Sequence, residues 1–184
     1  HAGGTEQVKT AFPTVETVSL LDNCQQSAAT SWQGLTLQIL WPPQGNARDD
    51  NNHSCVLHIS DAKHQVLIPG DIERFAEYQL LYSHTLTPVD ILIAPHHGSK
   101  TSSGPAFIEA VSPRTVVFTQ GYNNRWRFPH EQVVARYQKR GAQLLSTGNQ
   151  GYIRFTMAHN GIITHTARQH FMPRWYRKPD PLSP

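Results

Sequence analysis

Apolar and polar positions follow two different periods along the chain, and the period changes from one segment to the next. Alternation at period two, or a short run of β-branched and aliphatic residues, predicts a strand. Strands are expected over 15–21, 35–42, 55–60, 64–70, 143–148, 151–158 and 162–168. The pair 55–60 and 64–70 flanks Asp61–Lys63 and is expected to form a hairpin. Near-continuous apolar runs over 89–95 and 114–121 are typical of strands buried on both faces.

Three segments place apolar residues at helical spacing instead: 71–84, 104–112 and 129–142. Asp71 stands where it can cap the first helix, Gly104-Pro105 opens the second, and Gly141 ends the third. Helices and strands alternate in the middle of the chain, and strands dominate both ends. This order predicts a mixed α/β fold built in layers.

Length and composition restrict the picture only slightly. The 184 residues, 38% hydrophobic and 16% charged, suit one globular domain with a core of its own. A net charge of +3 is compatible with a polyanionic partner but does not demand one. No apolar run approaches the roughly 20 residues that span a bilayer, and no signal peptide is visible. The chain begins with His rather than Met, so we expect it to be part of a longer protein.

The stretch "LIAPHHGSKTSSG" (92–104) carries chemical groups at the end of a predicted buried strand. The neutral imidazoles of His96 and His97 can bind Zn, Mn or Fe. The stretch that follows, Ser99, Lys100 and Thr101, offers hydroxyl, ammonium and backbone N–H groups to a phosphate. A solvated turn is the alternative interpretation.

Two further positions could bind a metal ion. Asp71 follows Gly70 at a strand end, where a carboxylate can ligate one or two cations. A simple helix cap is the alternative, and spacing alone favours it. His1 precedes Gly3-Gly4 and is either a ligand on a tight turn or an expression remnant. Cys24 and Cys55 do not have the spacing of a metal site, and they could pair or stay free.

Arginine and aromatic residues alternate in the segment "GYNNRWRFPH" (121–130). The guanidinium groups of Arg125 and Arg127 could bind phosphates, and the indole of Trp126 could stack on a base. Alternatively, Trp126 and Phe128 fill the core. The basic and aromatic tail over 169–184 could touch nucleic acid or an anionic membrane, or could simply be solvated.

Taken in order, six segments of the chain resemble the metallo-β-lactamase-like domain at the C-terminus of the ComEC family, inner-membrane proteins that take up DNA during natural transformation. These segments are "HAGG", "NNHSCVLHI", "VLIPGDIE", "ILIAPHHGSKTSS", "AVSPRTVVFTQGYNNRWRFPH" and "GNQGYIRF". The resemblance implies an αββα sandwich over 1–168 with a metal site at one edge, followed by the tail 169–184. The family motif begins with a His/Asp cluster ending in Asp-His-x-Gly-Gly, and only its end is matched, by residues 1–4. The first part of the domain, with its ligands, is therefore expected to be missing.

The resemblance also implies a reaction, namely metal-dependent hydrolysis of phosphodiesters that degrades the non-transported DNA strand. Its cofactor would be one or two divalent ions, Mn or Zn, with no small organic cofactor. The implied metal ligands are His1, Asp71, His96 and His97, and the implied catalytic residues are Asp71, His97 and Lys100. The residues expected to bind phosphate or DNA are Ser99, Lys100, Thr101, Arg125, Trp126, Arg127 and His130.

Partners and location follow from the same resemblance. The partners would be single-stranded DNA and the rest of a membrane channel protein, with this domain on the periplasmic side. Lacking the upstream ligands, the chain by itself is expected to be a poor enzyme.

One departure and two alternatives remain open. Where many relatives have Gly-His-Pro, this chain has Arg127-Phe128-Pro129, followed by His130, which puts a ligand or acid role there in doubt. The alternatives are a non-catalytic module that binds DNA or gates the channel, and a small-molecule hydrolase with a deep, closed apolar pocket. The sequence leaves open the metal, the polarity of cleavage and the oligomeric state.

Overall fold

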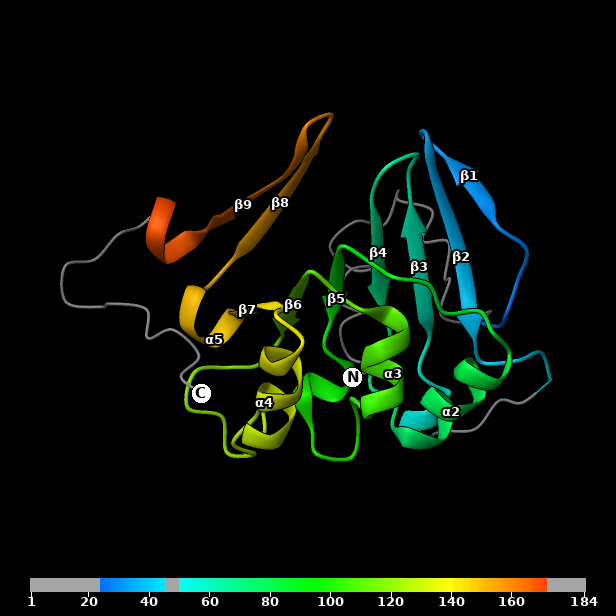
Figure 1. Ribbon diagram of the computed structural model, residues 1–184, viewed down its shortest axis with the longest axis horizontal. Helices are drawn as coiled ribbons and strands as arrows, with labels where there is room; N and C mark the ends of the chain where they lie inside the picture. The colour runs from blue at the N-terminus through cyan, green and yellow to red at the C-terminus, as the bar shows by residue number, and fades with distance from the viewer. Residues whose placement is uncertain (1–23, 46–49, 172–184) are drawn as a thin grey trace, which may run out of the picture.

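A computed structural model describes residues 24–45 and 50–171 of the chain (Figure 1). The strand predicted over 15–21, the possible ligand His1 and most of the predicted tail lie outside the described residues. In the part of the chain that is described, no helix has the length and apolar character needed to cross a membrane.

Seven strands form one mixed sheet in the order β1-β2-β3-β4-β5-β6-β7. They are β1 (Thr30–Trp32), β2 (Leu35–Trp41), β3 (Val56–Ser60), β4 (Gln65–Ile68), β5 (Ile91–Ile93), β6 (Thr115–Phe118) and β7 (Gln143–Ser146). The pairs from β1 to β4 are antiparallel, and the pairs from β4 to β7 are parallel. The predicted hairpin is the β3–β4 pair. Strand β1 was not predicted, because all three of its residues are exposed and leave no apolar pattern.

Three helices cover one face of this sheet: α2 (Arg74–Tyr82), α3 (Pro105–Val111) and α4 (Glu131–Lys139) (Figure 1). Each of the four parallel strands is joined to the next by one of them. As expected, Gly104 is the N-cap of α3 with Pro105 in its first turn, and Gly141, at φ 74°, follows the end of α4. Apolar side chains from the helices and from this face of the sheet, including Leu67, Phe107 and Phe118, form the main core.

A two-stranded sheet, β8 (Ile153–Ala158) and β9 (Gly161–Thr166), lies against the other face. Ile91, Val117 and Leu145 of the large sheet pack there against side chains such as Phe155 and Ile162. The described residues thus form a helical layer, a mixed sheet and a second small sheet, which are successive layers of the expected sandwich. The predicted mixed α/β class is confirmed.

The described residues also contain four short helical segments: η1 (Asn51–His53), η2 (Pro95–Gly98), α5 (Thr147–Gln150) and η3 (Ala167–Phe171). The strand predicted over 143–148 is shorter than expected, because the hydroxyl of Ser146 accepts a hydrogen bond from the Asn149 N–H and starts α5. Segment η3 runs across the predicted boundary between residues 168 and 169, and the division into domain and tail stays a prediction.

Cys24 and Cys55 form a disulfide, with their Cα atoms 5.7 Å apart. This settles the alternative that the sequence left open. The bond ties the start of the described chain to the residue just before β3. Beside it, the indole N–H of Trp41 donates to the Asn52 carbonyl oxygen at 2.6 Å, so the η1 turn is held against the sheet.

Candidate functional site

The predicted site residues gather at the carboxyl ends of the parallel strands. Asp71 follows β4, His96 and His97 follow β5, and Thr119 follows β6. Since β5 and β6 are parallel, the loops that leave them emerge at the same edge of the sheet, as predicted. Side chains far apart in the sequence therefore meet here.

His97 lies between two of these strand ends. Its Nε2 atom is 3.5 Å from Asp71 Oδ1, and its Nδ1 atom is 3.1 Å from the Thr119 hydroxyl. Both ring nitrogens thus face a polar group, which fixes the plane of the imidazole. Of the two histidines, His97 is the one that contacts Asp71, and the role of these residues as metal ligands stays a prediction.

His96 faces a different carboxylate. Its Nδ1 atom is 3.2 Å from Glu73 Oε1, and the Thr101 hydroxyl donates to the same Glu73 oxygen at 2.9 Å. Thr101 Oγ1 is also 3.5 Å from His96 Nδ1, so the three side chains form one cluster. The sequence analysis missed Glu73. The signal was present, as a second carboxylate two residues after Asp71 in "GDIE".

The turn that carries the two histidines has an unusual backbone. His96, His97 and Gly98 all adopt positive φ angles of 48°, 56° and 85°. Such a conformation costs of order 1–3 kcal/mol at a non-glycine residue, so the surroundings must enforce it. The His96 N–H donates to the Gly70 carbonyl oxygen at 3.0 Å, and the His130 N–H donates to that of Gly98 at 2.9 Å.

Gly98 is required by space as well as by conformation. A Cβ atom at this position would lie 2.7 Å from Pro129 Cβ and 2.8 Å from the ring of Phe118. The neighbouring Phe128 ring packs on both imidazoles, with centroids 5.8 Å from His96 and 6.3 Å from His97. Aromatic packing and backbone bonds together aim the histidines toward the strand ends.

Glu77, which the sequence analysis did not single out, clamps the loop after the histidines. Its side chain is almost fully buried and accepts the backbone N–H groups of Ser103 and Gly104, the latter at 2.8 Å. Arg136 donates to the Ser103 carbonyl oxygen at 3.1 Å, and the Tyr137 hydroxyl donates to Ser103 Oγ at 3.0 Å. Burial raises the pKa of Glu77, and the two N–H bonds oppose that shift only in part.

The predicted phosphate-binding residues of this loop differ in exposure. Lys100 is exposed, whereas Ser99 is buried and its hydroxyl lies 3.0 Å from that of Thr101. The Thr101 hydroxyl already donates a hydrogen bond to the Glu73 carboxylate. Thr101 is exposed as well as Lys100, and of the three Lys100 is the one that carries a charge.

Helix α2 is capped by a residue other than the predicted one. The helix begins at Arg74, and Asn52 Oδ1 accepts the N–H groups of Glu73 at 3.1 Å and Ala76 at 3.2 Å. The prediction that Asp71 caps this helix is wrong, because Asp71 stands before the first turn and its carboxylate faces His97. The capping residue comes from the η1 turn, about twenty residues earlier in the chain, where no local pattern reveals it.

The loop after β6 exposes its aromatic and basic groups. The Arg125 guanidinium lies over the Trp126 ring at 4.0 Å, and Trp126 is 61% exposed. The interpretation of Trp126 as part of the core is therefore wrong, whereas Phe128 does pack inward on the histidines. Arg127 adopts a positive φ of 54°, and its N–H donates to the Asn124 carbonyl oxygen. The His130 ring accepts the Gln132 N–H at 3.3 Å and caps α4.

A cavity of about 540 Å³ joins these groups. It is lined by Asp71, His96, His97, Thr119, Gln120, Gly121, Asn124, Trp126 and Phe128. The structure thus brings together the carboxylate, both imidazoles and the indole from the predicted set. Lys100, Arg125, Arg127 and His130 are not among the lining residues, and His1 lies outside the described part of the chain.

The donors around this cavity fit part of a metal shell. Carboxylate and imidazole ligands suit Mn or Zn, and a catalytic zinc site typically has three protein ligands. Among residues 24–45 and 50–171, however, no group of three or more His, Cys, Asp and Glu side chains is arranged to hold an ion. Asp71 and the two histidines therefore supply an incomplete set within the described chain.

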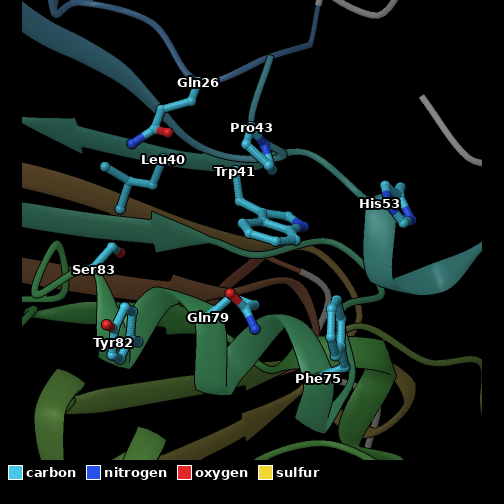
Figure 2. A pocket seen from close by; sticks show the side chains of 9 residues that line it. All are labelled: Gln26, Leu40, Trp41, Pro43, His53, Phe75, Gln79, Tyr82 and Ser83. Atoms are coloured by element: carbon cyan, nitrogen blue, oxygen red, sulfur yellow. The ribbon is translucent and has the colours of Figure 1, made fainter. Parts of the chain in front are cut away.

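A second cavity, of about 320 Å³, lies between α2 and the end of β2 (Figure 2). It is lined by Gln26, Leu40, Trp41, Pro43, His53, Phe75, Gln79, Tyr82 and Ser83. None of these is acidic or permanently basic, and His53 Nδ1 is held 2.8 Å from Asp50 Oδ1. This cavity lacks the carboxylate and paired imidazoles of the first, which is the better candidate for chemistry.

Comparison with known proteins shows the family. The chain is 33% identical to Recombination protein 2 of Haemophilus influenzae, over 97% of this chain and 23% of that protein. It is 33% identical to Competence protein ComA of Neisseria gonorrhoeae, over 80% of this chain and 21% of that protein. It is also 33% identical to the uncharacterized protein YcaI of Escherichia coli, over 97% of this chain and 24% of that protein. The chain belongs to the ComEC family of competence proteins.

The chain spans about a quarter or less of the length of these relatives. No protein-family model matches it. A solved structure of the metallo-beta-lactamase superfamily from Thermotoga maritima is similar with a TM-score of 0.39 and 10% identity, covering 66% of this chain and 69% of that chain. This likeness concerns the fold alone, and at this score it adds no argument about the site.

Proposed function

We propose that this chain is the hydrolase module of a membrane DNA-uptake protein and that it cleaves phosphodiesters of the DNA strand that is not transported. In this proposal it lies on the periplasmic side of the membrane and acts together with the rest of a longer channel protein. Family membership supports the role in competence.

The single observation that carries the proposal is the composition of the larger cavity. Its lining includes Asp71, His96 and His97 together with Trp126, whose indole is exposed. Carboxylate and imidazole groups suit a divalent ion, and an exposed indole suits a nucleobase. Ionisable groups in the lining, namely Asp71, His96 and His97, disfavour the alternative of an apolar pocket for a small molecule.

The chain's own residues would divide the work as follows. Asp71, His96 and His97 would hold one or two divalent ions, Mn or Zn, together with ligands from outside the described residues, His1 among them. A bound ion of this kind lowers the pKa of water and neutralises phosphate charge. Thr119 orients the His97 ring, and Glu73 with Thr101 orients the His96 ring. Exposed Lys100 would add a cation for the phosphate.

The decisive experiment assays labelled single-stranded DNA in Mn²⁺, Zn²⁺ or EDTA. The protein is the domain extended by the parental residues that precede His1, beside the 184-residue chain. We expect metal-dependent cleavage by the extended domain and little by the chain. Asp71→Asn should lower metal affinity by roughly 10- to 100-fold or more and abolish most of the rate, because the amide carries no charge.

The matched control is Glu109→Gln, which removes an exposed carboxylate of α3 that pairs with Arg140 and does not line the cavity. It should leave both metal binding and rate unchanged. Metal content that is the same in Asp71→Asn, Glu109→Gln and the parent would contradict the assignment of Asp71. Robust cleavage by the 184-residue chain alone would contradict the need for upstream ligands.

A second candidate is a DNA-binding or gating module without catalysis. The Arg125–Trp126 pair favours it, because an exposed cation–indole pair binds nucleic acid without any metal. Single-strand binding that persists in EDTA, combined with absent cleavage under every metal, would select this candidate.

A further inference from the structure

The charge of the chain is divided sharply between its two parts. Residues 110–184 hold eleven Lys and Arg against two acidic residues, whereas residues 1–109 hold five against eleven. No Asp or Glu occurs over 110–130 or over 132–179. Such asymmetry indicates a preferred side for a polyanion. The candidate site lies on the boundary, with Asp71 and Glu73 from the acidic part and the loop after β6 from the basic part.

Exposed aromatic rings lie on the basic side of this boundary. Tyr122 is 65% exposed and Tyr152 is 63% exposed, in addition to Trp126. Two of these rings, Trp126 and Tyr122, have an arginine beside them. The Arg125 guanidinium lies 4.0 Å from the Trp126 ring centre, and that of Arg168 lies 5.9 Å from the Tyr122 ring centre. Flat rings interleaved with guanidinium groups are the surface that binds single-stranded nucleic acid.

Contacts connect these residues to one another in a continuous series. Tyr122 directly follows Gly121, which lines the cavity. Helix α5 packs against Gly121, because a Cβ atom on Gly148 of α5 would lie 3.2 Å from the Gly121 carbonyl oxygen. Arg168 donates to the Gly148 and Asn149 carbonyl oxygens, each at 2.5 Å. The stem of the same arginine passes Gly151, whose neighbour is Tyr152. In Figure 1 the loop after β6 and α5 lie on the same side of the large sheet.

We propose that Tyr122, Arg168 and Tyr152, here called the stacking strip, bind the nucleotides next to those in the cavity, so that a single strand leaves the site across α5 toward β8. This inference rests on the proposed function, because it requires that the cavity take single-stranded DNA. The inference adds a path for the bound DNA, which runs from the cavity over the basic part of the chain and away from α2. Stacking on successive rings tolerates any base, which makes the strip independent of sequence.

Binding without hydrolysis tests the strip. The 184-residue chain is titrated in EDTA with fluorescent oligodeoxynucleotides of about 4 and about 12 nucleotides, lengths that span the site sizes of single-strand binders. Tyr122→Ala and Tyr152→Ala should each lower the affinity for the longer oligonucleotide by roughly 5- to 150-fold and the affinity for the shorter one much less. Tyr122→Phe, which keeps the ring, should restore affinity to within about twofold of the parent.

Tyr82→Ala is the matched control, because Tyr82 is 85% exposed but belongs to α2 on the acidic part. It should bind both oligonucleotides as the parent does. The strip is overturned, with the proposed function intact, if Trp126→Ala loses affinity while Tyr122→Ala and Tyr152→Ala do not. If the parent chain binds neither oligonucleotide, both the strip and the proposed DNA substrate are overturned. Equal losses in Tyr82→Ala would also overturn the strip, because the effect would not be confined to the basic part.

Discussion

The two sides of the candidate site are built in opposite ways. On the acidic side, Asp71 contacts His97, Glu73 contacts His96 and Thr101, and buried Glu77 fixes the loop at Ser103. On the basic side, the loop after β6 is closed mainly on itself. Asn124 donates to the Phe128 carbonyl oxygen at 2.7 Å and accepts its N–H at 2.9 Å, while Trp126 stays exposed.

This difference separates two requirements. Groups that hold an ion must be placed to within a fraction of an ångström. The hydrogen bonds that support the acidic side from several elements are what the proposed ion site would require. A ring that stacks on a base needs only an accessible face, so the basic side can remain exposed and lightly constrained. Substitutions on the acidic side should therefore change stability, and those on the basic side should change binding.

The largest expected effect comes from Glu77. Glu77→Ala removes a buried carboxylate that bonds two backbone N–H groups and lies near Arg74 and Arg136, and it should lower the free energy of unfolding by about 3–5 kcal/mol. Urea denaturation measures this loss. Glu109→Ala, at an exposed carboxylate, should stay within about 0.5 kcal/mol of the parent. If Glu77→Ala and Glu109→Ala lost the same unfolding free energy, the assignment of Glu77 as a buried group that stabilises the loop would be wrong.

Glu77 should also change how the free energy of unfolding depends on pH. Burial raises its pKa in the folded state above the ordinary 4.5, so the folded chain binds this proton more tightly than the unfolded chain. The contribution of the protonated group is complete below pH 4.5 and is lost as pH rises through the folded-state pKa. A comparison of unfolding free energies across this range should show that Glu77→Gln lacks the decline. An identical pH profile in the parent and in Glu77→Gln would contradict the assigned shift.

The disulfide should have the next largest effect. It closes a segment of 31 residues, and its removal by Cys24→Ser with Cys55→Ser should cost about 2–4 kcal/mol, mainly through the entropy of the unfolded chain. Denaturation with and without the substitutions measures the loss. Affinity for single-stranded DNA per folded molecule should not change. A loss of affinity in the folded double variant would mean that the two sides are less independent than the contacts indicate.

A smaller loss is expected at Asn52. Asn52→Ala deprives the Glu73 and Ala76 N–H groups of their acceptor and should destabilise the fold by about 1 kcal/mol. Asn52→Asp, which retains the acceptor, should recover most of that stability, and thermal unfolding of both variants checks this. If Asp71 were the cap after all, Asn52→Ala would be neutral.

The smallest effect on stability belongs to the basic side. Trp126→Ala should change the free energy of unfolding by less than about 0.5 kcal/mol, because the ring is exposed. The same variant should lose about 1–3 kcal/mol of binding free energy for single-stranded DNA. Thermal unfolding and fluorescence titration are measured on one preparation. If Trp126→Ala unfolded at a lower temperature but bound single-stranded DNA normally when folded, Trp126 would contribute to stability rather than to binding.

The sequence predicted the elements whose side chains carry a strong period. The hairpin of β3 and β4, the helix opened by Gly104-Pro105 and the helix ended by Gly141 were all identified from local pattern. The double histidine and Asp71 were identified because a buried strand ends just before each of them. Parallel pairing of β5 and β6 then explains why they share an edge with the loop that contains Trp126.

What the sequence could not reveal depends on contacts between distant residues. Glu77 binds N–H groups 26 and 27 positions later, and Asn52 caps a helix that starts 22 positions later. Neither bond leaves a local pattern, so a buried glutamate looks like an ordinary helix residue and a capping asparagine like part of a polar loop. The exposure of Trp126 was equally hidden, because an aromatic residue in a loop fits core and surface alike.

The bond between Cys24 and Cys55 bears on how the protein is produced. A bacterial cytoplasm keeps thiols reduced, and secretory compartments allow them to pair. A preparation from a reducing host, or one handled in a thiol reagent, would contain a chain with its first described residues untied from β3. Samples from oxidising and reducing hosts should therefore be treated as two different proteins until mass spectrometry has counted their free thiols.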